Sequence, residues 1–393
     1  MSGDVLPGAG ERVVVAMSGG VDSSVAAALL TESGCEVIGI SLRLADERPG
    51  GASIGCCSLE DFHDAARVAD ALGVPHYVFD MREAFRRDVV APFVEEYLAG
   101  RTPSPCILCN RSIKFTALRR RAAELGAQWV ATGHYARRDY DGTRYRLLCG
   151  TDGAKDQSYF LFEMDQAGLA HTLFPVGHMT KDAVRAYAAS RGIVTAGKAD
   201  SQEICFVADG GYAEFVEKAA PGRVRHGQFV DAEGTVLGRH AGVHRYTVGQ
   251  RRGLGIAHCD PLYVESVDAA TATVRVGPRG DLRRGGLVAD GVVWTSGQAQ
   301  PGGARVDARI RYRHRGVAAT LWPRPGEQLE VVFDEPQEGV SPGQAVVFYR
   351  AEEVIGGAWI RESLPVATAS SRDTGRAGRT AGEPSASACP EPR

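Results

Sequence analysis

The chain has 393 residues, enough for two or three domains that each bury a core of their own. Its apolar fraction is 44%, and no apolar run approaches the roughly 18 residues of a membrane-spanning segment, so we expect no membrane association. The formal net charge of −3 excludes a generally basic protein, and any nucleic-acid partner must therefore be bound by local positive patches.

The N-terminus and the cysteines indicate a cellular compartment. Residues 1–11 are polar and lack the charged and apolar regions of a signal peptide, so we expect a cytoplasmic protein. Nine cysteines, an odd number at uneven spacing, favour thiols over a disulfide framework.

A glycine-rich turn at residues 18–23, Ser-Gly-Gly-Val-Asp-Ser, joins a predicted strand at Arg12–Met17 to a predicted helix at Ser24–Leu30. The two glycines allow backbone angles that other residues resist. The serine hydroxyls and the first N–H groups of the helix then point toward one place, where the helix dipole favours an anion. The turn lacks the lysine of a Walker loop and the Gly-x-Gly-x-x-Gly of a dinucleotide site. It therefore predicts an anion site of another class, and a strand-turn-helix without a ligand is the alternative.

Strands and helices alternate after this turn. The expected strands are Val37–Leu42, Tyr77–Phe79 and Trp129–Thr132, and the expected helices are Leu59–Leu72 and Ile113–Leu125. This alternation predicts an α/β domain with a doubly wound parallel sheet. Ligands bind at the carboxyl ends of such strands, so we expect the first turn and Gly133-His134 to face one nucleotide.

Beyond about Gly211 the helical pattern fades, and the stretch to about Gly286 is predicted to be a small linking domain. Short strands with period-2 alternation then predict a compact β-barrel, at Val292–Thr295, Ala304–Tyr312, Leu329–Phe333 and Ala345–Tyr349. Residues 365–393 offer little to bury and are expected to be disordered. The predicted domains are 1–210, 211–286 and 287–364, followed by that tail.

Arginines recur along the predicted strand Ala304–Tyr312 and just beyond it. Alternation of side chains along a strand places Arg305, Arg309, Arg311 and Arg313 on one face. Further basic residues that could extend this face are His314, Arg315, Arg245, Arg251 and Arg252. Together they predict a surface that follows phosphates, with a merely solvated strand face as the alternative.

Two more stretches place cysteines in distinctive settings. In residues 101–110, Arg-Thr-Pro-Ser-Pro-Cys-Ile-Leu-Cys-Asn, two prolines stiffen a loop ahead of the helix predicted from Ile113. Cys109 is therefore expected near a helix N-terminus, where its pKa should fall and its thiolate is favoured. The other stretch, residues 200–206, contains Cys205, for which a small core residue is the favoured interpretation when it is taken alone.

The cysteines are also compatible with metal binding. Cys106 and Cys109 have no second pair at zinc-finger spacing, but an iron-sulfur site of Cys106, Cys109 and Cys205 is an alternative. The remaining cysteines are interpreted as packing or incidental residues, namely Cys35, Cys56, Cys57, Cys149, Cys259 and Cys389.

Residues 18–23, 101–110 and 200–206 together resemble the bacterial tRNA-uridine 2-sulfurtransferases, also called tRNA-specific 2-thiouridylases, from about Val13 to Leu364. The first stretch is similar to the pyrophosphate loop of N-type ATP pyrophosphatases. Further matching motifs are Ala131-Thr-Gly-His-Tyr135, Lys155-Asp-Gln-Ser-Tyr-Phe-Leu161, Thr247-Val-Gly-Gln-Arg-Arg-Gly-Leu-Gly255 and Ser341-Pro-Gly-Gln344.

The resemblance implies ATP-dependent 2-thiolation of the wobble uridine, U34, in the anticodon loop of tRNA. AMP would be transferred to the C2 oxygen and then displaced by sulfur. Cys205 would carry that sulfur as a persulfide, and Cys109 would be the nucleophile that releases sulfide or resolves a persulfide–base adduct. Both routes end in a Cys109–Cys205 disulfide. A persulfide relay protein or cysteine desulfurase is implied as the sulfur donor.

The resemblance also implies binding residues. ATP would be bound by Ala16, Met17, Ser18, Gly19, Gly20, Val21, Asp22, Ser23, Leu42 and Gly133. Asp22 is expected to hold Mg²⁺, with a plain carboxylate at a helix start as the alternative. The tRNA, with its target base flipped out, would contact His134, Lys155, Asp156, Gln157, Arg311, Tyr312 and Gln344.

Cys106 departs from the family pattern, because several members have Asp at this position. Reference pKa values of about 3.9 for Asp and about 8.5 for Cys place the two groups in opposite protonation states near neutral pH. Three roles are open, namely proton transfer, a resolving thiol and an iron-sulfur ligand, of which proton transfer is favoured.

Two rival functions are compatible with parts of the sequence. One is a pyrophosphatase-type synthetase that uses ammonia, which needs no pair of cysteines. The other is an RNA-binding protein whose nucleotide site is inactive. Failure to form AMP and pyrophosphate with any tRNA would favour the RNA-binding protein. An unchanged rate after removal of Cys109 would favour the ammonia-using synthetase.

Overall fold

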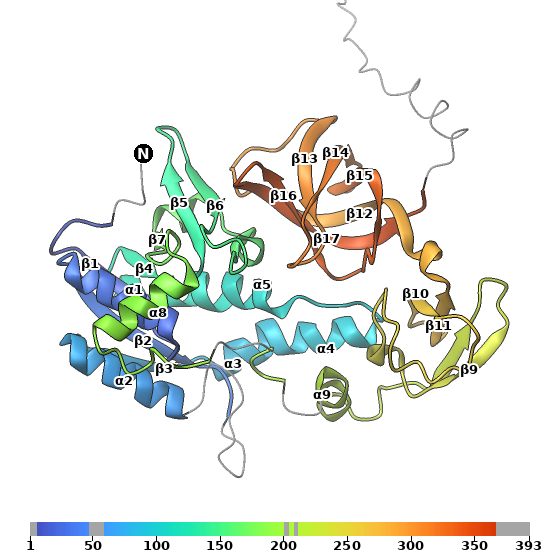
Figure 1. The fold of residues 1–393 in the computed structure, drawn as a ribbon, viewed down its shortest axis with the longest axis horizontal. Coiled ribbons are helices and arrows are strands. Elements are labelled where there is room, and N and C mark those ends of the chain that lie inside the picture. The colour runs from blue at the N-terminus through green and yellow to red at the C-terminus, as the bar shows by residue number, and fades with distance from the viewer. Residues whose placement is uncertain (1–5, 47–58, 200–203, 208–210, 367–393) are drawn as a thin grey trace, which may run out of the picture.

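The computed structural model describes residues 6–46, 59–199, 204–207 and 211–366. Figure 1 shows three parts, an α/β part that begins at the N-terminus, a small part with β9 to β11, and a barrel formed by the last strands. Expectations for Cys56, Cys57, Cys389 and the tail beyond residue 366 fall outside the described residues, as do those for residues 200–203.

The α/β part contains the elements from β1 to α8. Its strands are β1 (Arg12–Ala16), β2 (Glu36–Arg43), β3 (His76–Asp80), β4 (Trp129–Ala131), β5 (Ala136–Tyr140), β6 (Tyr145–Cys149) and β7 (Thr172–Leu173). Its α-helices are α1 (Val21–Glu32), α2 (Leu59–Leu72), α3 (Arg82–Phe85), α4 (Ala91–Leu98), α5 (Pro105–Cys109), α6 (Leu118–Glu124), α7 (Gln166–Ala170) and α8 (Lys181–Ser190). The π-helical segments η1 (Arg86–Val90) and η2 (Asn110–Ala117) and the 3₁₀ turn η3 (Ser158–Leu161) complete it.

Five parallel strands form the central sheet in the order β3-β2-β1-β4-β7. Val13 and Val15 of β1 pack against α1 and α2 on one face, and Val14 packs against α6 on the other. Helices on both faces explain why β1 continues as an unbroken apolar run after Arg12, and they confirm the predicted doubly wound α/β class. The strand order reverses beside β1, so the loops that follow β1 and β4 flank the point where such sheets bind ligands.

The helix predicted from Ile113 begins eight residues earlier. Helix α5 starts at Pro105 and continues without a break through η2 and α6 to Glu124. Proline suits the first position of a helix because its missing N–H would have no partner there. The expectation that residues 101–110 are a loop ahead of the helix is therefore wrong for its second half. Cys106 lies in the first turn and Cys109 in the second, so the dipole acts more strongly on Cys106.

The linking part contains α9 (Gly211–Ala219), β8 (Gly227–Val230), β9 (Val236–His240), η4 (Val243–Arg245), β10 (Tyr263–Asp268), β11 (Thr273–Gly277) and η5 (Arg279–Leu282). Its four strands form one sheet in the order β10-β11-β8-β9. Buried side chains such as Phe229 and Val264 give it a core of its own.

The barrel is formed by β12 (Arg283–Val293), β13 (Ala304–Arg309), β14 (Val317–Arg324), β15 (Gln328–Glu338), β16 (Ala345–Arg350) and β17 (Glu353–Leu364). Pairing between β12 and β17 closes the sheet, which confirms the predicted β-barrel. Two strands, β14 and β17, escaped prediction, and the strand expected at Val292–Thr295 ends at Val293. The strand expected to reach Tyr312 ends at Arg309.

The barrel is extended by a hairpin from the α/β part. Strand β6 pairs with β17, and β5 pairs with β6, so the barrel sheet continues into residues 136–149. Among the helices that the structure describes, none is long and apolar enough to cross a membrane.

Candidate functional site

The turn after β1 is shaped to leave helix N–H groups accessible. The Ser18 N–H donates to Ser23 Oγ at 3.2 Å, and Ser23 Oγ donates to the Gly20 carbonyl at 3.1 Å, which curls the turn over the start of α1. Gly19 has a φ of +71°, and a Cβ there would lie 2.3 Å from the Asp61 carbonyl oxygen. Among the described residues no side chain caps α1, so its first N–H groups are available to an anion.

The loop after β4 lies directly on this helix start. A Cβ at Gly133 would approach the Ser23 nitrogen to 2.6 Å and the Asp22 carbonyl carbon to 2.7 Å, so only glycine allows the contact. The structure thus brings together the residues predicted to face one nucleotide, at the carboxyl ends of adjacent strands.

Lys181 is a residue of this site that sequence reasoning missed. It is the first residue of α8, its side chain is 9% exposed, and its Nζ lies 2.9 Å from both carboxylate oxygens of Asp22. The Tyr135 hydroxyl donates to the same carboxylate at 2.7 Å. The sequence offered one signal for such a residue. Because the turn lacks the lysine of a Walker loop, a positive charge for the anion had to come from another part of the chain.

These contacts leave acceptor capacity on the Asp22 carboxylate, so its expected role as a magnesium ligand stays a prediction. Both of its oxygens already accept hydrogen bonds from Lys181, and the ammonium group provides the local positive charge. We therefore assign no step of the reaction to a metal ion.

Leu42, Cys109 and Cys205 belong to one apolar cluster. Leu42 lies near the end of β2, Cys109 near the end of α5, and Cys205 in the segment 204–207. Cys109 is buried and Cys205 is partly buried. The neighbouring Phe206 anchors the latter segment through edge-on contacts with Phe85 and Phe93, with ring centroids 5.5 and 5.0 Å apart. Two cysteines distant in sequence therefore belong to the same apolar cluster as Leu42, the residue expected to contact the adenine.

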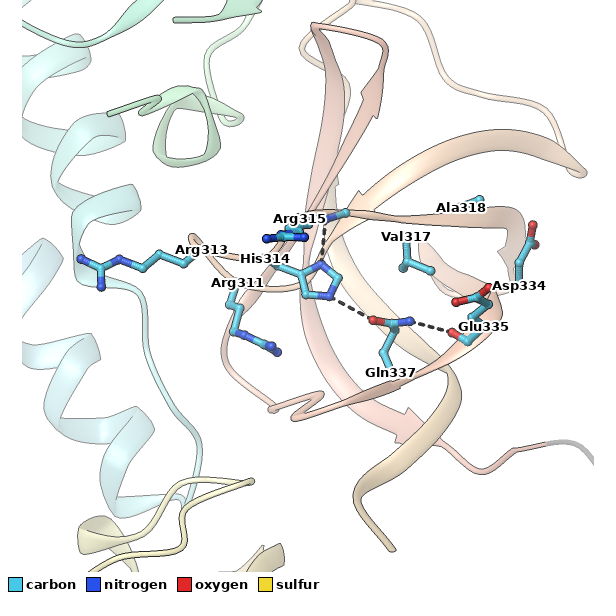
Figure 2. A pocket seen from close by; sticks show the side chains of 10 residues that line it. Arg311, Arg313, His314, Arg315, Val317, Ala318, Asp334, Glu335 and Gln337 are labelled. Carbon is cyan, nitrogen blue, oxygen red and sulfur yellow. Dashed lines mark hydrogen bonds between the residues drawn. The ribbon is translucent and has the colours of Figure 1, made fainter. Parts of the chain in front are cut away.

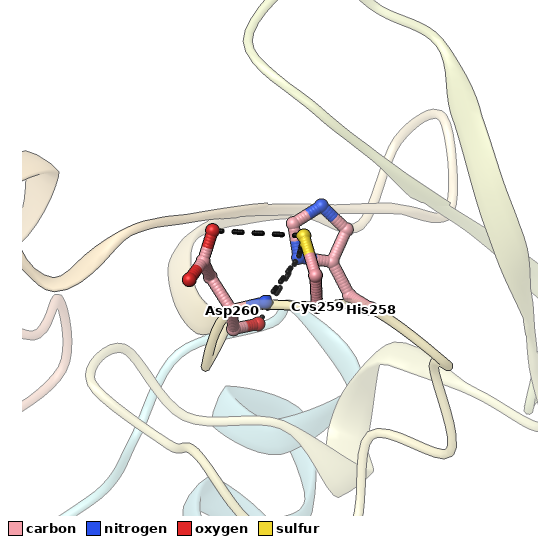
Figure 3. A group of neighbouring side chains, drawn as sticks. All are labelled: His258, Cys259 and Asp260. Carbon is pink, nitrogen blue, oxygen red and sulfur yellow. Dashed lines mark hydrogen bonds between the residues drawn. The ribbon is translucent and has the colours of Figure 1, made fainter.

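Cys106 differs from Cys109 in that it is exposed. Within the described ranges, three metal-ligating side chains approach within 4.8 Å only at His258, Cys259 and Asp260, on an exposed loop of the linking part (Figure 3). Cys106, Cys109 and Cys205 form no such group for a single ion, and the iron-sulfur alternative stays a prediction.

Three residues expected to contact tRNA also make hydrogen bonds that hold loops together, and their tRNA contacts stay a prediction. His134 Nδ1 lies 2.8 Å from Thr132 Oγ1, and burial lowers the pKa of His134 well below its usual value, so its ring is neutral near pH 7. Gln157 Oε1 accepts from the Tyr135 N–H at 3.0 Å. Asp156 is buried and accepts hydrogen bonds from the N–H groups of Gly150 and Ser158, both at 3.1 Å.

The predicted arginine face is altered because β13 ends at Arg309. Arg309 Nη1 lies 2.9 Å from Asp156 Oδ2, and its guanidinium lies 3.9 Å from the ring centroid of Tyr349. Arg305 Nη1 donates to Asp334 Oδ1 at 2.7 Å. Acidic partners thus engage both Arg309 and Arg305, and the predicted role of these two residues in binding phosphates stays a prediction.

Four residues of the predicted basic surface, Arg311, Arg313, His314 and Arg315, line a hollow of about 620 Å³ on the barrel, at the loop between β13 and β14 (Figure 2). Arg245 of the linking part pairs with Glu217 instead. Arg311, Arg313 and Arg315 are exposed, and Arg313 points away from the barrel. His314 lies 3.0 Å from Gln337 Oε1, and burial lowers its pKa, so the positive charge of this loop comes from the arginines.

Tyr312 and Gln344 do not face this hollow. They lie toward the cysteine helix, the helix that starts at Pro105 and contains Cys106 and Cys109. The Tyr312 ring packs on Phe160 with centroids 4.4 Å apart. Burial raises the pKa of Tyr312. Gln344 donates to the carbonyls of Thr102 and Pro103 at 3.0 and 3.2 Å.

Comparison with known families and proteins gives consistent matches. Family models match as a tRNA methyl transferase HUP domain over residues 11–209, a tRNA methyl transferase PRC-barrel domain over 213–278 and an aminomethyltransferase beta-barrel domain over 284–360. A relative from Geotalea uraniireducens (strain Rf4), named tRNA-specific 2-thiouridylase MnmA, is 51% identical over 369 residues, 92% of this chain and 98% of its own. A relative of the same name from Geobacter metallireducens is 52% identical over 361 residues, 90% and 98% of the two chains.

Similarity to solved structures is restricted to part of the fold. A 4-thiouridine synthetase in complex with RNA and ATP is 16% identical with a TM-score of 0.35, covering 54% of this chain and 51% of that chain. At this level the match does not bear on function.

Proposed function

The chain belongs to the tRNA-specific 2-thiouridylase family of tRNA sulfurtransferases, as its resemblance predicted, and from this premise we propose that it uses ATP to exchange the C2 oxygen of uridine 34 for sulfur. The proposal rests on one observation above all, the apolar cluster to which Leu42, Cys109 and Cys205 all belong. Membership of one cluster supports sulfur chemistry beside a nucleotide site.

The first step is activation of the uridine oxygen. The C2 oxygen attacks the α-phosphorus of ATP, the bond to the β-phosphate oxygen breaks, and pyrophosphate leaves. The α1 N–H groups and Lys181 Nζ would stabilise the phosphate charge, because both lie at the turn of residues 18–23. The product is a uridine whose C2 oxygen carries AMP, a much better leaving group than the oxygen itself.

The second step transfers sulfur. A partner protein would load Cys205 with a persulfide, written as Cys205–S–SH. The Cys109 thiolate attacks the inner sulfur of Cys205, so that hydrosulfide is released and a Cys109–Cys205 disulfide forms. Hydrosulfide adds to C2 and AMP departs with the original oxygen. An external dithiol then reduces the disulfide. Alternatively, the persulfide attacks C2 directly and Cys109 resolves the adduct, with the same disulfide as the outcome.

The test is mass spectrometry of anticodon nucleosides after incubation of the protein with tRNA, a sulfide source and a reductant, with and without ATP. We expect 2-thiouridine only when ATP is present. AMP and pyrophosphate without a thiolated product would favour the ammonia-using synthetase, and tRNA binding without pyrophosphate would favour the inactive RNA-binding protein.

The exposed arginines at the barrel hollow are expected to bind tRNA phosphates. Combined Arg311→Ala, Arg313→Ala and Arg315→Ala substitutions should reduce the slope of log affinity against log salt by about 0.7 to 0.9 for each phosphate that is no longer neutralised. Filter binding of tRNA over a range of KCl concentrations measures this slope. Arg191→Ala is the control, since it removes an exposed arginine that pairs with Glu32 on α1. A parental slope in the triple variant would show that these arginines do not bind phosphates.

A further inference from the structure

A turn of the barrel, residues 341–344, is fastened to the segment that precedes the cysteine helix. The Thr102 N–H donates to the Pro342 carbonyl at 2.8 Å, and Ser341 Oγ donates to Thr102 Oγ1 at 3.1 Å. Gln344 donates to the Thr102 carbonyl at 3.0 Å. At Gly343, whose φ is +88°, a Cβ would lie 3.0 Å from Arg101 Cβ and from the Thr102 N and O atoms. The two backbones therefore approach as closely as glycine permits.

The linking part reaches the same residue. Thr102 Oγ1 donates to Thr247 Oγ1 at 3.3 Å, while it accepts from Ser341. Thr247 is itself held through its N–H, which donates to Gln250 Oε1 at 3.1 Å. One threonine side chain thus contacts all three parts of the molecule.

The chain between Thr102 and the cysteines has little freedom to absorb movement. Pro103 and Pro105 have restricted φ angles, Ser104 is buried, and the helix starts at Pro105. The barrel also contacts the far side of the cysteines, because Tyr312 packs on Phe160, whose carbonyl accepts from Asn110 Nδ2 at 3.0 Å. Barrel contacts therefore bracket the helical turns that contain Cys106 and Cys109.

We propose that Thr102 is a positioning residue through which the barrel turn 341–344 sets the placement of Cys109. The barrel then has a role in the chemical step in addition to binding tRNA. The part that concerns sulfur transfer rests on the proposed function, whereas the placement of Cys109 is a property of the protein alone.

Two substitutions weaken the junction in different ways. Thr102→Val keeps the shape of the side chain but removes the hydroxyl that joins Ser341 and Thr247, and Thr102→Ser restores that hydroxyl. Gly343→Ala inserts a methyl group between the two backbones. Its control is Gly326→Ala, because Gly326 also has a positive φ, +74°, but its Cβ would have no neighbour within 4 Å.

The first readout is alkylation of Cys109 by iodoacetamide, measured by peptide mass spectrometry relative to the exposed Cys259. Cys109 is 8% exposed, so loosening of its helix should raise its relative alkylation rate by about tenfold in Thr102→Val and Gly343→Ala. Thr102→Ser and Gly326→Ala should resemble the parent. Because this readout needs neither ATP nor tRNA, it remains informative if the proposed function fails.

The second readout is tRNA thiolation at saturating ATP. We expect Thr102→Val and Gly343→Ala to lower kcat by about tenfold to a hundredfold with KM for tRNA nearly unchanged, because a misplacement of about 1 Å can cost that much. A raised KM with parental kcat and parental alkylation would overturn the proposal and assign the turn to tRNA binding alone. Parental alkylation rates of Cys109 together with parental kcat in both Thr102→Val and Gly343→Ala would also overturn the proposal.

Discussion

A Cys109→Ser variant is expected to lose tRNA 2-thiolation by at least about 10³-fold while it still releases pyrophosphate from ATP and tRNA. Loss of a nucleophile typically abolishes the step it performs, since a serine hydroxyl cannot form the disulfide that releases sulfur. Adenylation should continue because the groups expected to stabilise the phosphates belong to α1 and α8, and the substitution changes neither helix. Nucleoside mass spectrometry and a coupled pyrophosphate assay measure the two steps separately.

The same variant should accumulate sulfur on Cys205. After incubation with a persulfide donor, the peptide containing Cys205 should gain one sulfur atom, which reductant removes. Cys259→Ser is the matched control, since Cys259 is exposed on a loop of the linking part and should not affect either step. Accumulation on Cys109 in a Cys205→Ser variant would reverse the two roles, and parental thiolation by Cys109→Ser would show that Cys109 is not the nucleophile.

A Lys181→Met variant is expected to release pyrophosphate about 10²-fold to 10³-fold more slowly than the parent. Removal of one preorganised charged donor lowers the catalytic rate by about that factor when the site excludes water. Here the loss is compounded, because the Asp22 carboxylate remains without its nearest cation and faces the phosphates. The pyrophosphate release rate and the KM for ATP are the measurements, and KM should rise.

Two controls separate catalysis from stability in this experiment. Lys218→Met removes a lysine that is 80% exposed on α9 and should leave the rate unchanged. The double variant Asp22→Asn with Lys181→Met removes both charges, so its melting temperature should recover toward the parental value because no buried charge is left uncompensated. Its pyrophosphate rate should remain low. Recovery of both would mean that the ion pair acts only in folding.

Features that depend on neighbours in the chain could be derived from the sequence. The buried strand at Arg12–Ala16, the helix Leu59–Leu72 and the turn between β1 and α1 follow from apolar periodicity and from the backbone freedom of glycine. These signals report which face of an element is buried and where the chain can bend. They were sufficient for the α/β class and the barrel, and the combined motifs were sufficient for the family.

Features that depend on distant partners were decided by the tertiary structure. Lys181 meets Asp22 across 159 residues of chain, and Arg309 turns from the expected tRNA surface to Asp156 across 153 residues. The junction at Thr102 likewise depends on a barrel whose turn at Ser341 lies 239 residues further along the chain than Thr102. Periodicity cannot report such pairs, because an ion pair or a hydrogen bond depends on the distance between atoms, and the packing of the three parts sets that distance.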